Sequence, residues 1–284
     1  MASSMGMSNS VQRESPLPTQ SVIGFPVSVL SFNQQVEAIL GWASERASKV
    51  VCVANVHMLM EGYWKPEFAK VLTEADLLTP DGMPLVWVTS LLKRKRQQRA
   101  AGMELMQALC RRAQKSGVSV FFLGSENETL EKIRTRLAKD FPQLKIAGML
   151  SPPFRPLSTA EDSAIVERIN QSGAGLVFVS LGCPKQEMWM SEHRGRVKGT
   201  MIGLGGAFPV YAGVKQWAPK WVRNNGLEWL YRLLQEPGRL WKRYASTIPP
   251  FIWLAIKQIV KARLGIAPDM SLKQKYLGLS RVFY

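Results

Sequence analysis

The sequence is poor in the residues that build metal sites and disulfide scaffolds. Its 284 residues include two histidines, His57 and His193, and three cysteines, Cys52, Cys110 and Cys183, which lie far apart and form no C-x-x-C pair. Two histidines exclude a histidine-rich metal site. An odd and sparse set of cysteines argues against a disulfide scaffold and fits a reducing compartment.

Several motifs of nucleotide-binding and hydrolytic enzymes are also absent. The chain has no G-x-G-x-x-G fingerprint, no G-x-x-x-x-G-K-[ST] phosphate loop and no G-x-S-x-G nucleophile elbow. Its five aspartates never form D-x-D, the pair with which many sugar transferases hold a metal-bound nucleotide diphosphate. If this chain handles a diphosphate, helix N-termini, lysine and arginine have to neutralise it.

Long apolar runs and acidic residues are scarce as well. No apolar run reaches the roughly 18–20 residues that span a bilayer. The first residues, MASSMGMSNSVQRESPLPTQ, lack the apolar core of a signal peptide, so we expect residues 1–22 to form a disordered tail. The 37 Lys and Arg against 21 Asp and Glu give a net charge of +16. This charge predicts an anionic partner: nucleic acid, phospholipid or a phosphorylated substrate.

Short apolar segments alternate with amphipathic ones from Gly24 onward. We expect strands at residues 27–30, 50–54, 118–123, 145–149, 176–180 and 201–204, and helices near 33–46, 83–92, 102–116, 127–139, 159–172, 184–194 and 226–260. Nearly continuous apolar strands alternating with helices indicate a mostly parallel sheet with helices on both faces. The expected fold class is therefore α/β and Rossmann-like, with a core at residues 23–215 and a helical appendage at 216–284.

Turns with glycine or polar residues follow several predicted strands, at the edge where such sheets bind ligands. They contain Asn55, Asp81, Gly82, Gly124, Ser125, Glu126, Gly182, Pro184, Lys185 and Gly205. Glycine lets the backbone approach a ligand closely, and a helix N-terminus offers unpaired N–H groups to a diphosphate. These turns predict a nucleotide site.

Simpler interpretations of the same turns stay open. Residues 81–82 can be a capped turn and residues 124–125 a tight turn between a strand and a helix. Gln186 and Glu187 can lie on a solvated first turn of a helix. Cys183 has no base near it in the sequence and is expected to be a packed thiol.

The motifs resemble one family in their order along the chain. The segments ADLLTPDGMPLVW, RAAG, SLGCPKQEMWM, GLGGAF and APKWVRNNGLEWLYRLLQEPGRLWKRY are similar to those of the WecG/TagA/CpsF glycosyltransferases, over about residues 26–255. The resemblance implies an inverting, metal-independent bacterial enzyme without a cofactor. It implies transfer of glucose, N-acetylmannosamine or its uronic acid from UDP to a polyprenyl-diphosphate-linked sugar, at the cytoplasmic face of the membrane, in the synthesis of cell-surface polysaccharide.

The resemblance also implies roles for four residues of the core. Asp81 matches the proposed catalytic base, Asn55 matches an asparagine that lines the sugar pocket, Gln186 matches the active-site glutamine, and Arg99 matches the arginine of an R-x-x-G motif. An inverting transfer needs one base to take the proton of the acceptor hydroxyl, and a single carboxylate suits this role. Val53 stands where the family usually has threonine, which leaves the contacts to the donor sugar open.

In the appendage the resemblance implies a set of cations for a diphosphate. Arg232 and Arg239 match family arginines, and either Lys242 or Arg243 fills the next basic position. Arginine binds phosphate oxygens through two parallel hydrogen bonds without losing its proton. On one continuous helix these residues could share a face, but residues 237–238 (Pro-Gly) should kink or restart the helix.

The appendage otherwise has the composition of an interfacial helix. Residues 220–263 contain nine basic and two acidic residues, and five of the nine tryptophans lie at positions 217, 221, 229, 241 and 253. This pattern predicts docking on anionic lipid, with a peripheral location on the inner face of a bacterial membrane. The alternative is a C-terminal helix that packs its aromatic side chains on the sheet.

Other function classes remain to be weighed. The run KRKRQQR at residues 93–99 and the net charge could indicate nucleic-acid binding, but no RNP1, helix-turn-helix or zinc-finger pattern supports it, so we expect no nucleic-acid partner. A Rossmann-like methyltransferase or an enzyme that modifies nucleotide sugars is the other alternative. The sequence leaves a homo-oligomer possible.

Overall fold

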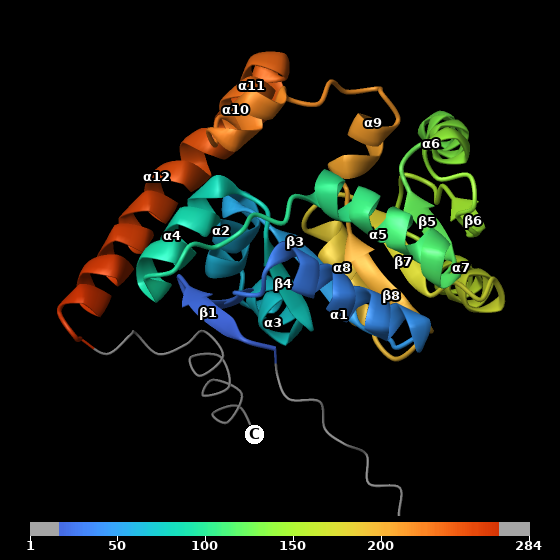
Figure 1. The fold of residues 1–284 in the computed structure, drawn as a ribbon, viewed down its shortest axis with the longest axis horizontal. Helices are drawn as coiled ribbons and strands as arrows, with labels where there is room; N and C mark the ends of the chain where they lie inside the picture. The colour runs from blue at the N-terminus through green and yellow to red at the C-terminus, as the bar shows by residue number, and fades with distance from the viewer. Residues whose placement is uncertain (1–16, 267–284) are drawn as a thin grey trace, which may run out of the picture.

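A computed structural model describes residues 17–266 and shows an α/β fold built on one parallel sheet (Figure 1). The six strands run in the order β4-β3-β8-β7-β5-β6, and every neighbouring pair is parallel. They are β3 (Val50–Ala54), β4 (Leu77–Pro80), β5 (Val120–Gly124), β6 (Ile146–Leu150), β7 (Leu176–Ser180) and β8 (Thr200–Gly203). The predicted fold class is confirmed.

Helices cover both faces of the sheet. On one face lie α1 (Phe32–Ser44), α5 (Gly102–Ser116), α6 (Asn127–Asp140) and α9 (Ala207–Tyr211). On the other lie α2 (Val56–Trp64), α3 (Pro66–Glu74), α4 (Met83–Lys93), α7 (Thr159–Gln171) and α8 (Lys185–Glu192). The appendage consists of α10 (Lys220–Asn224), α11 (Glu228–Gln235) and α12 (Pro237–Arg263).

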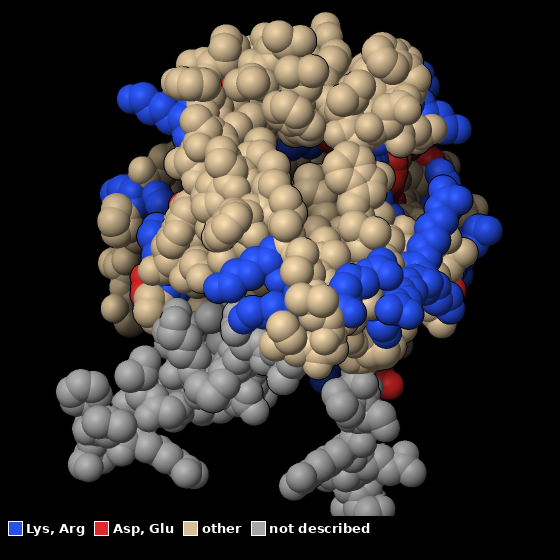
Figure 2. Space-filling model, turned by 90° about the vertical axis from the view of Figure 1, so that its left-hand side faces the viewer, with Lys and Arg blue, Asp and Glu red and all other residues tan. Residues whose placement is uncertain are grey.

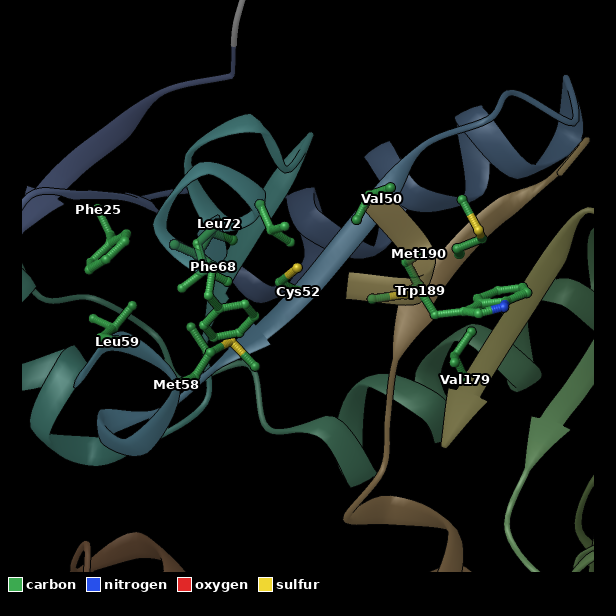
Figure 3. Close-up of a cluster of buried hydrophobic side chains, with 14 of the residues drawn as sticks. Phe25, Val50, Cys52, Met58, Leu59, Phe68, Leu72, Val179, Trp189 and Met190 are labelled. Atoms are coloured by element: carbon green, nitrogen blue, oxygen red, sulfur yellow. The ribbon is translucent and has the colours of Figure 1, made fainter. Parts of the chain in front are cut away.

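Each face of the sheet has its own hydrophobic core. Along β3, Val50, Cys52 and Ala54 point into one core, while Val51 and Val53 point into the other. This alternation follows from the two-residue period of a strand, and it requires a strand that is apolar throughout. Figure 3 shows part of the first core, where side chains of β3, α2, α3 and α8 meet.

The long helix α12 packs against the core rather than projecting from it. Its buried residues Leu240, Thr247, Phe251 and Ala255 recur at helical spacing, and the last two belong to the first core. The helix contacts α2 and α4, and Figure 1 shows it along that side of the molecule. No helix within residues 17–266 has both the length and the hydropathy that a membrane span requires.

Most expected elements are found within two residues of their predicted ends, and the predicted restart at residues 237–238 is confirmed. The expected helix at 226–260 is two helices, because α11 ends at Gln235 and α12 begins at Pro237. The sequence did not predict β4, α2, α3, α9 or α10. The four residues of β4 end in proline, too short a run to count as a strand.

The N-terminal expectations need correction. The strand expected at 27–30 is not in the parallel sheet; β2 (Phe25–Ser28) instead forms an antiparallel pair with β1 (Thr19–Val22). The disordered tail predicted for residues 1–22 is therefore wrong over β1, and residues 1–16 lie outside the described residues. Gln258 of α12 accepts from the Ile23 N–H at 2.8 Å and donates to the Ser21 carbonyl at 2.8 Å, which ties this hairpin to α12.

Candidate active site

One cavity of about 790 Å³ lies at the carboxyl ends of the strands, between the core and the appendage. Its lining comes from the turns after four adjacent strands: β4, β3, β8 and β7. The core residues at its polar end are Asn55, Asp81, Gly82, Arg99, Gly182, Gln186 and Gly205. Parallel strands end at one edge of a sheet, which explains why these distant sequence positions converge.

Asp81 follows β4 directly and is held in place by its backbone. Its N–H donates to the Ala54 carbonyl of β3 at 2.9 Å. Burial raises the pKa of the Asp81 carboxyl from its usual 3.8 to about 6; Glu228 adds to the rise, while Arg232 and Arg99 oppose it. A carboxylate with a pKa near neutral can accept a proton and still be mostly ionised at pH 7.

Asn55 caps a helix with its side chain and also lines the cavity. It is the N-cap of α2, and its Oδ1 accepts from the Met58 N–H at 3.1 Å. The cap fixes the amide plane and leaves the amide N–H2 group as the donor of this side chain. Asn55 lines the cavity, so this donor is available to a bound sugar or diphosphate.

Gln186 and Glu187 form a buried polar pair under the cavity. Gln186 is 5% exposed and Glu187 is fully buried, and Gln186 Nε2 donates to Glu187 Oε1 at 2.7 Å. Within the described residues, Gln186 Oε1 has no hydrogen-bond partner. Burial raises the pKa of the Glu187 carboxyl to about 7. The interpretation of these residues as a solvated first turn is therefore wrong.

Two glycines make room for this pair. A Cβ atom on Gly205 would lie 2.6 Å from Gln186 Oε1, and one on Gly203 would lie 2.9 Å from Gln186 Nε2. The GLGG segment thus allows the strand end to approach the amide. Glu187 is the residue that the sequence analysis missed as part of the site, and its position directly after Gln186 was the one available signal.

Arginines of the core and the appendage share one carboxylate. Glu228 of α11 accepts from Arg99 Nη1 at 2.9 Å and from Arg232 Nη2 at 2.8 Å. Arg99 also contacts Glu104 at 3.3 Å, and its side chain is almost buried. The pairs join the appendage to the core beside Asp81 and place two guanidinium groups at the cavity.

The remaining predicted cations of the appendage differ in their surroundings. Arg239 lines the cavity and pairs with Glu236, which also pairs with Lys215. Arg243 lines the cavity and has no carboxylate partner in the described part of the chain. Lys242 is exposed and is not in the lining. Of the two alternatives for the third cation, the geometry places Arg243 at the cavity.

Several predicted nucleotide contacts lie outside this cavity: Gly124, Ser125, Glu126, Pro184 and Lys185. Gly124 ends β5, Ser125 and Glu126 follow it, and β5 is separated from β8 by β7. A Cβ atom on Gly124 would lie 2.3 Å from the Ser180 carbonyl oxygen, which also accepts from the Ser125 N–H at 3.1 Å. This turn thus packs β5 tightly against β7, and any contact with a nucleotide stays a prediction.

Most tryptophans of the appendage are exposed. Trp221, Trp241 and Trp253 face solvent, and Trp229, 40% exposed, lines the cavity and packs edge-on against Tyr244. Trp217 is half-buried, with the Arg223 guanidinium 3.7 Å from its ring centre. The alternative that these aromatic side chains pack on the sheet is therefore wrong for four of the five. Among residues 17–266, no group of three or more His, Cys, Asp and Glu is arranged to hold a metal ion.

Comparison with known proteins gives a consistent set of similarities. The model of the glycosyl transferase WecG/TagA/CpsF family matches residues 20–265. An N-acetylglucosaminyldiphosphoundecaprenol N-acetyl-beta-D-mannosaminyltransferase of Bacillus spizizenii is 32% identical over 208 residues, 73% of this chain and 78% of that protein. Proteins with the same description are 28% identical, over 76% of this chain and 82% of the relative in Bacillus subtilis, and over 90% and 98% in Staphylococcus aureus strain MW2.

Proposed function

The chain belongs to the WecG/TagA/CpsF family of glycosyltransferases, and we propose that it transfers a hexose derivative from a UDP-sugar to a sugar linked to polyprenyl diphosphate. The observation that carries this proposal is the single cavity that brings together Asp81, the buried amide of Gln186 and the cations of the appendage. The names of the relatives support N-acetylmannosamine as the transferred sugar and N-acetylglucosaminyl-diphosphoundecaprenol as the acceptor.

In the proposed reaction Asp81 is the general base. It takes the proton of the acceptor hydroxyl while that oxygen attacks the anomeric carbon of the donor. The bond from this carbon to UDP breaks, and UDP leaves with the electron pair, so the configuration inverts. The pKa of about 6 suits this role, because the base is ionised at pH 7 and still accepts a proton readily.

Arginine groups neutralise the diphosphate in this scheme. Arg99 and Arg232 are held by Glu228, and Arg243 has no carboxylate partner among the described residues. A diphosphate that enters the cavity competes with Glu228 for the two guanidinium groups and meets Arg243 directly. Fixed cations at a site that excludes water stabilise the charge that develops on the leaving UDP. We expect activity without a metal ion, and therefore in the presence of EDTA.

The surface near the cavity supports a peripheral location on the inner face of a bacterial membrane. On the side that carries the end of α12, Figure 2 shows a broad uncharged surface, a hollow within it and a band of Lys and Arg below, with few acidic side chains. The exposed large side chains of α12 include Trp241 and Trp253, and Leu264, its C-cap residue, is exposed as well. Aromatic and apolar groups beside cations are the pattern of interfacial docking.

The test is a panel of UDP-sugars offered with synthetic N-acetylglucosaminyl-diphosphoprenol, with the products identified by mass. The expected result is UDP release together with one added N-acetylhexosamine on the lipid. Addition of a hexose or a hexuronic acid derivative instead would support the proposed transfer reaction and identify a different donor sugar. If no UDP-sugar of the panel gives a glycosylated lipid product, the proposed function is wrong, even where the protein binds the UDP-sugar.

A further inference from the structure

The cavity does not end at the polar site. It continues as a groove between α12 on one side and α2 and α4 on the other. The residues that line this part are Val56, His57, Met58, Met83, Pro84, Trp87, Val88, Thr247, Ile248, Phe251, Ile252, Ala255, Ile256 and Ile259. None is Lys, Arg, Asp or Glu. His57 is the titratable group, and burial followed by the charge of Arg243 lowers its pKa to about 4, so it is neutral at pH 7.

One face of α12 changes character along its length. Arg239 and Arg243 line the cavity near the polar site, and Ile248, Ile252 and Ile256 continue the same face at intervals of four to five residues. From Arg243 to Ile259 the helix rises by about 24 Å, at about 1.5 Å per residue. The cavity therefore offers, in order, a sugar site, cations and a long apolar groove.

We propose that this groove binds the part of the acceptor's prenyl chain nearest the diphosphate, an inference that rests on the proposed function. The order of chemistry along the cavity is the order of groups along the acceptor: sugar, diphosphate, hydrocarbon. A nucleotide or a sugar is polar and gains little from contact with this apolar lining, whereas a bound prenyl chain buries the lining and itself away from water. The groove stays partly open, since Trp87, Ile252 and Ile256 are each about half exposed.

The groove is continuous with the cations and the base, which favours the acceptor over bulk lipid or a second copy of the chain as its occupant. Bulk lipid would occupy the groove without any relation to the length of the acceptor chain. The prenyl chain instead contributes affinity that grows with its length until the groove is filled. The site thereby holds the acceptor diphosphate against Arg243 while the rest of the lipid stays in the membrane.

The test compares two variants one helical turn apart. Ile256 lines the groove and is 52% exposed, whereas Val260 does not line it and is 49% exposed. Ile256→Gln and Val260→Gln each replace a half-exposed aliphatic side chain with a good helix former, so both should fold and both weaken general contact with lipid equally. Binding is measured in detergent micelles, by competition with a fluorescent prenyl diphosphate, for prenyl diphosphates of one isoprene unit and of increasing length.

In the unmodified protein we expect affinity to rise with chain length. In Ile256→Gln the affinity for the long probes should fall on the order of 10-fold, the equivalent of about 1.4 kcal/mol of lost apolar contact, with the one-unit probe unchanged. Val260→Gln should match the unmodified protein at every length. Equal affinity for all lengths, or an equal loss in both variants, would overturn the proposal.

Turnover separates this inference from the proposed function. Transfer to an acceptor with a short chain tests the reaction without the groove. If the unmodified protein transfers to the short acceptor and shows no preference for length, the groove assignment fails and the function stands. If length-dependent binding is seen without transfer to any acceptor, the groove assignment stands and the function fails.

Discussion

At the scale of single residues, the proposed reaction places two carboxyl groups, whose pKa values burial raises, in or beside the site. For Asp81, the rise to about 6 means that the base becomes protonated as the pH falls through 6. We expect kcat/KM to decrease about 10-fold per pH unit below about 6. A pH–rate profile at acceptor concentrations well below KM measures this limb, and a flat profile down to pH 5 would exclude Asp81 as the titrating base.

Replacement of the base gives a second prediction. Asp81→Asn keeps the size of the side chain and removes its ability to accept a proton, so turnover should drop by roughly 10²–10⁴-fold. Affinity for UDP should change little, because the proposed contacts to the diphosphate come from arginine side chains and not from the Asp81 carboxyl. Turnover and UDP binding are measured on the same preparation, and near-normal turnover would remove Asp81 from this role.

Glu187 gives a prediction about both orientation and stability. Its carboxyl accepts from Gln186 Nε2, so Glu187→Gln replaces a charged acceptor with a neutral amide oxygen and should lower kcat/KM for the donor by up to about 10-fold. Because the folded protein raises this pKa from 4.5 to about 7, the folded state binds more protons than the unfolded state between these values. Stability therefore falls as the pH rises from about 4.5 to 7.

The size of this linkage is about 3 kcal/mol for a shift of this extent, as an upper bound for a buried group. The free energy of unfolding from denaturant titrations at pH 5 and pH 8 should differ less in Glu187→Gln than in the unmodified protein. Gln186→Ala is the matched control: it removes the amide and leaves the titrating group, so the pH dependence of stability should persist.

The residues of the site were predictable to different degrees. Asp81, Asn55 and Gln186 stand in short motifs beside strand ends, and the parallel sheet brings such ends together. Glu187 was not recognised because a glutamate in a first helical turn is usually solvated, and its burial depends on two glycines that are distant in sequence. The turn at residues 124–125 has the same sequence character as the others but follows a strand farther along the sheet.

At the scale of elements, α11 places its cation through an ion pair with the core. If Arg232 binds a phosphate oxygen as proposed, Arg232→Ala should lower turnover by about 10- to 150-fold, the equivalent of about 1.5–3 kcal/mol for one charge-assisted contact. The remaining pair of Glu228 with Arg99 keeps α11 docked. Co-sedimentation with liposomes should therefore be unchanged while turnover falls.

Arg239→Ala is the comparison within the appendage. Arg239 pairs with Glu236 at the junction of α11 and α12, and it also lines the cavity. A loss of turnover with liposome binding kept would support a role at the diphosphate. If both variants turn over normally while they still bind liposomes, the arginines of the appendage take no part in the reaction.

The helices of the appendage were predictable only in outline. Composition and spacing indicated an interfacial helix, and proline at 237 indicated its restart. The packing of α12 against α2 and α4 was not predictable, because its apolar residues read equally well as membrane-facing or core-facing until tertiary contacts divide them. The same contacts explain β1: its pairing and its hydrogen bonds to Gln258 come from a segment over 230 residues away.

At the scale of the whole molecule, the basic run at residues 93–96 lies on the side that we expect to face the membrane. All four of its side chains are exposed, and none has a carboxylate partner in the described part of the chain. The run begins at the last residue of α4, which contacts α12, and Figure 1 shows both helices on the side of the molecule away from α6. We therefore expect it to meet anionic lipid together with the end of α12.

Replacement of residues 93–96 with glutamine tests this orientation. Each cation near an anionic leaflet contributes about 1 kcal/mol, so affinity for vesicles with phosphatidylglycerol should fall by at least 10-fold at low salt. The difference should shrink as ionic strength rises, because exposed charges are screened within a Debye length. The measurement is co-sedimentation with vesicles of graded anionic content, beside turnover on a water-soluble acceptor, which should not change.

The control removes four cations from the other end of the molecule: Lys132, Arg134 and Lys139 of α6, and Lys145, directly before β6. This variant has the same net charge as the first, so a nonspecific effect of charge would weaken vesicle binding equally in both. Orientation by residues 93–96 predicts that the control binds vesicles as the unmodified protein does. A membrane contact requires the cations to be on the side that carries α12, so an equal loss of vesicle binding in the two variants would show an effect of net charge alone. If residues 93–96 prove necessary for RNA binding and unnecessary for vesicle binding, the basic run belongs to a nucleic-acid site.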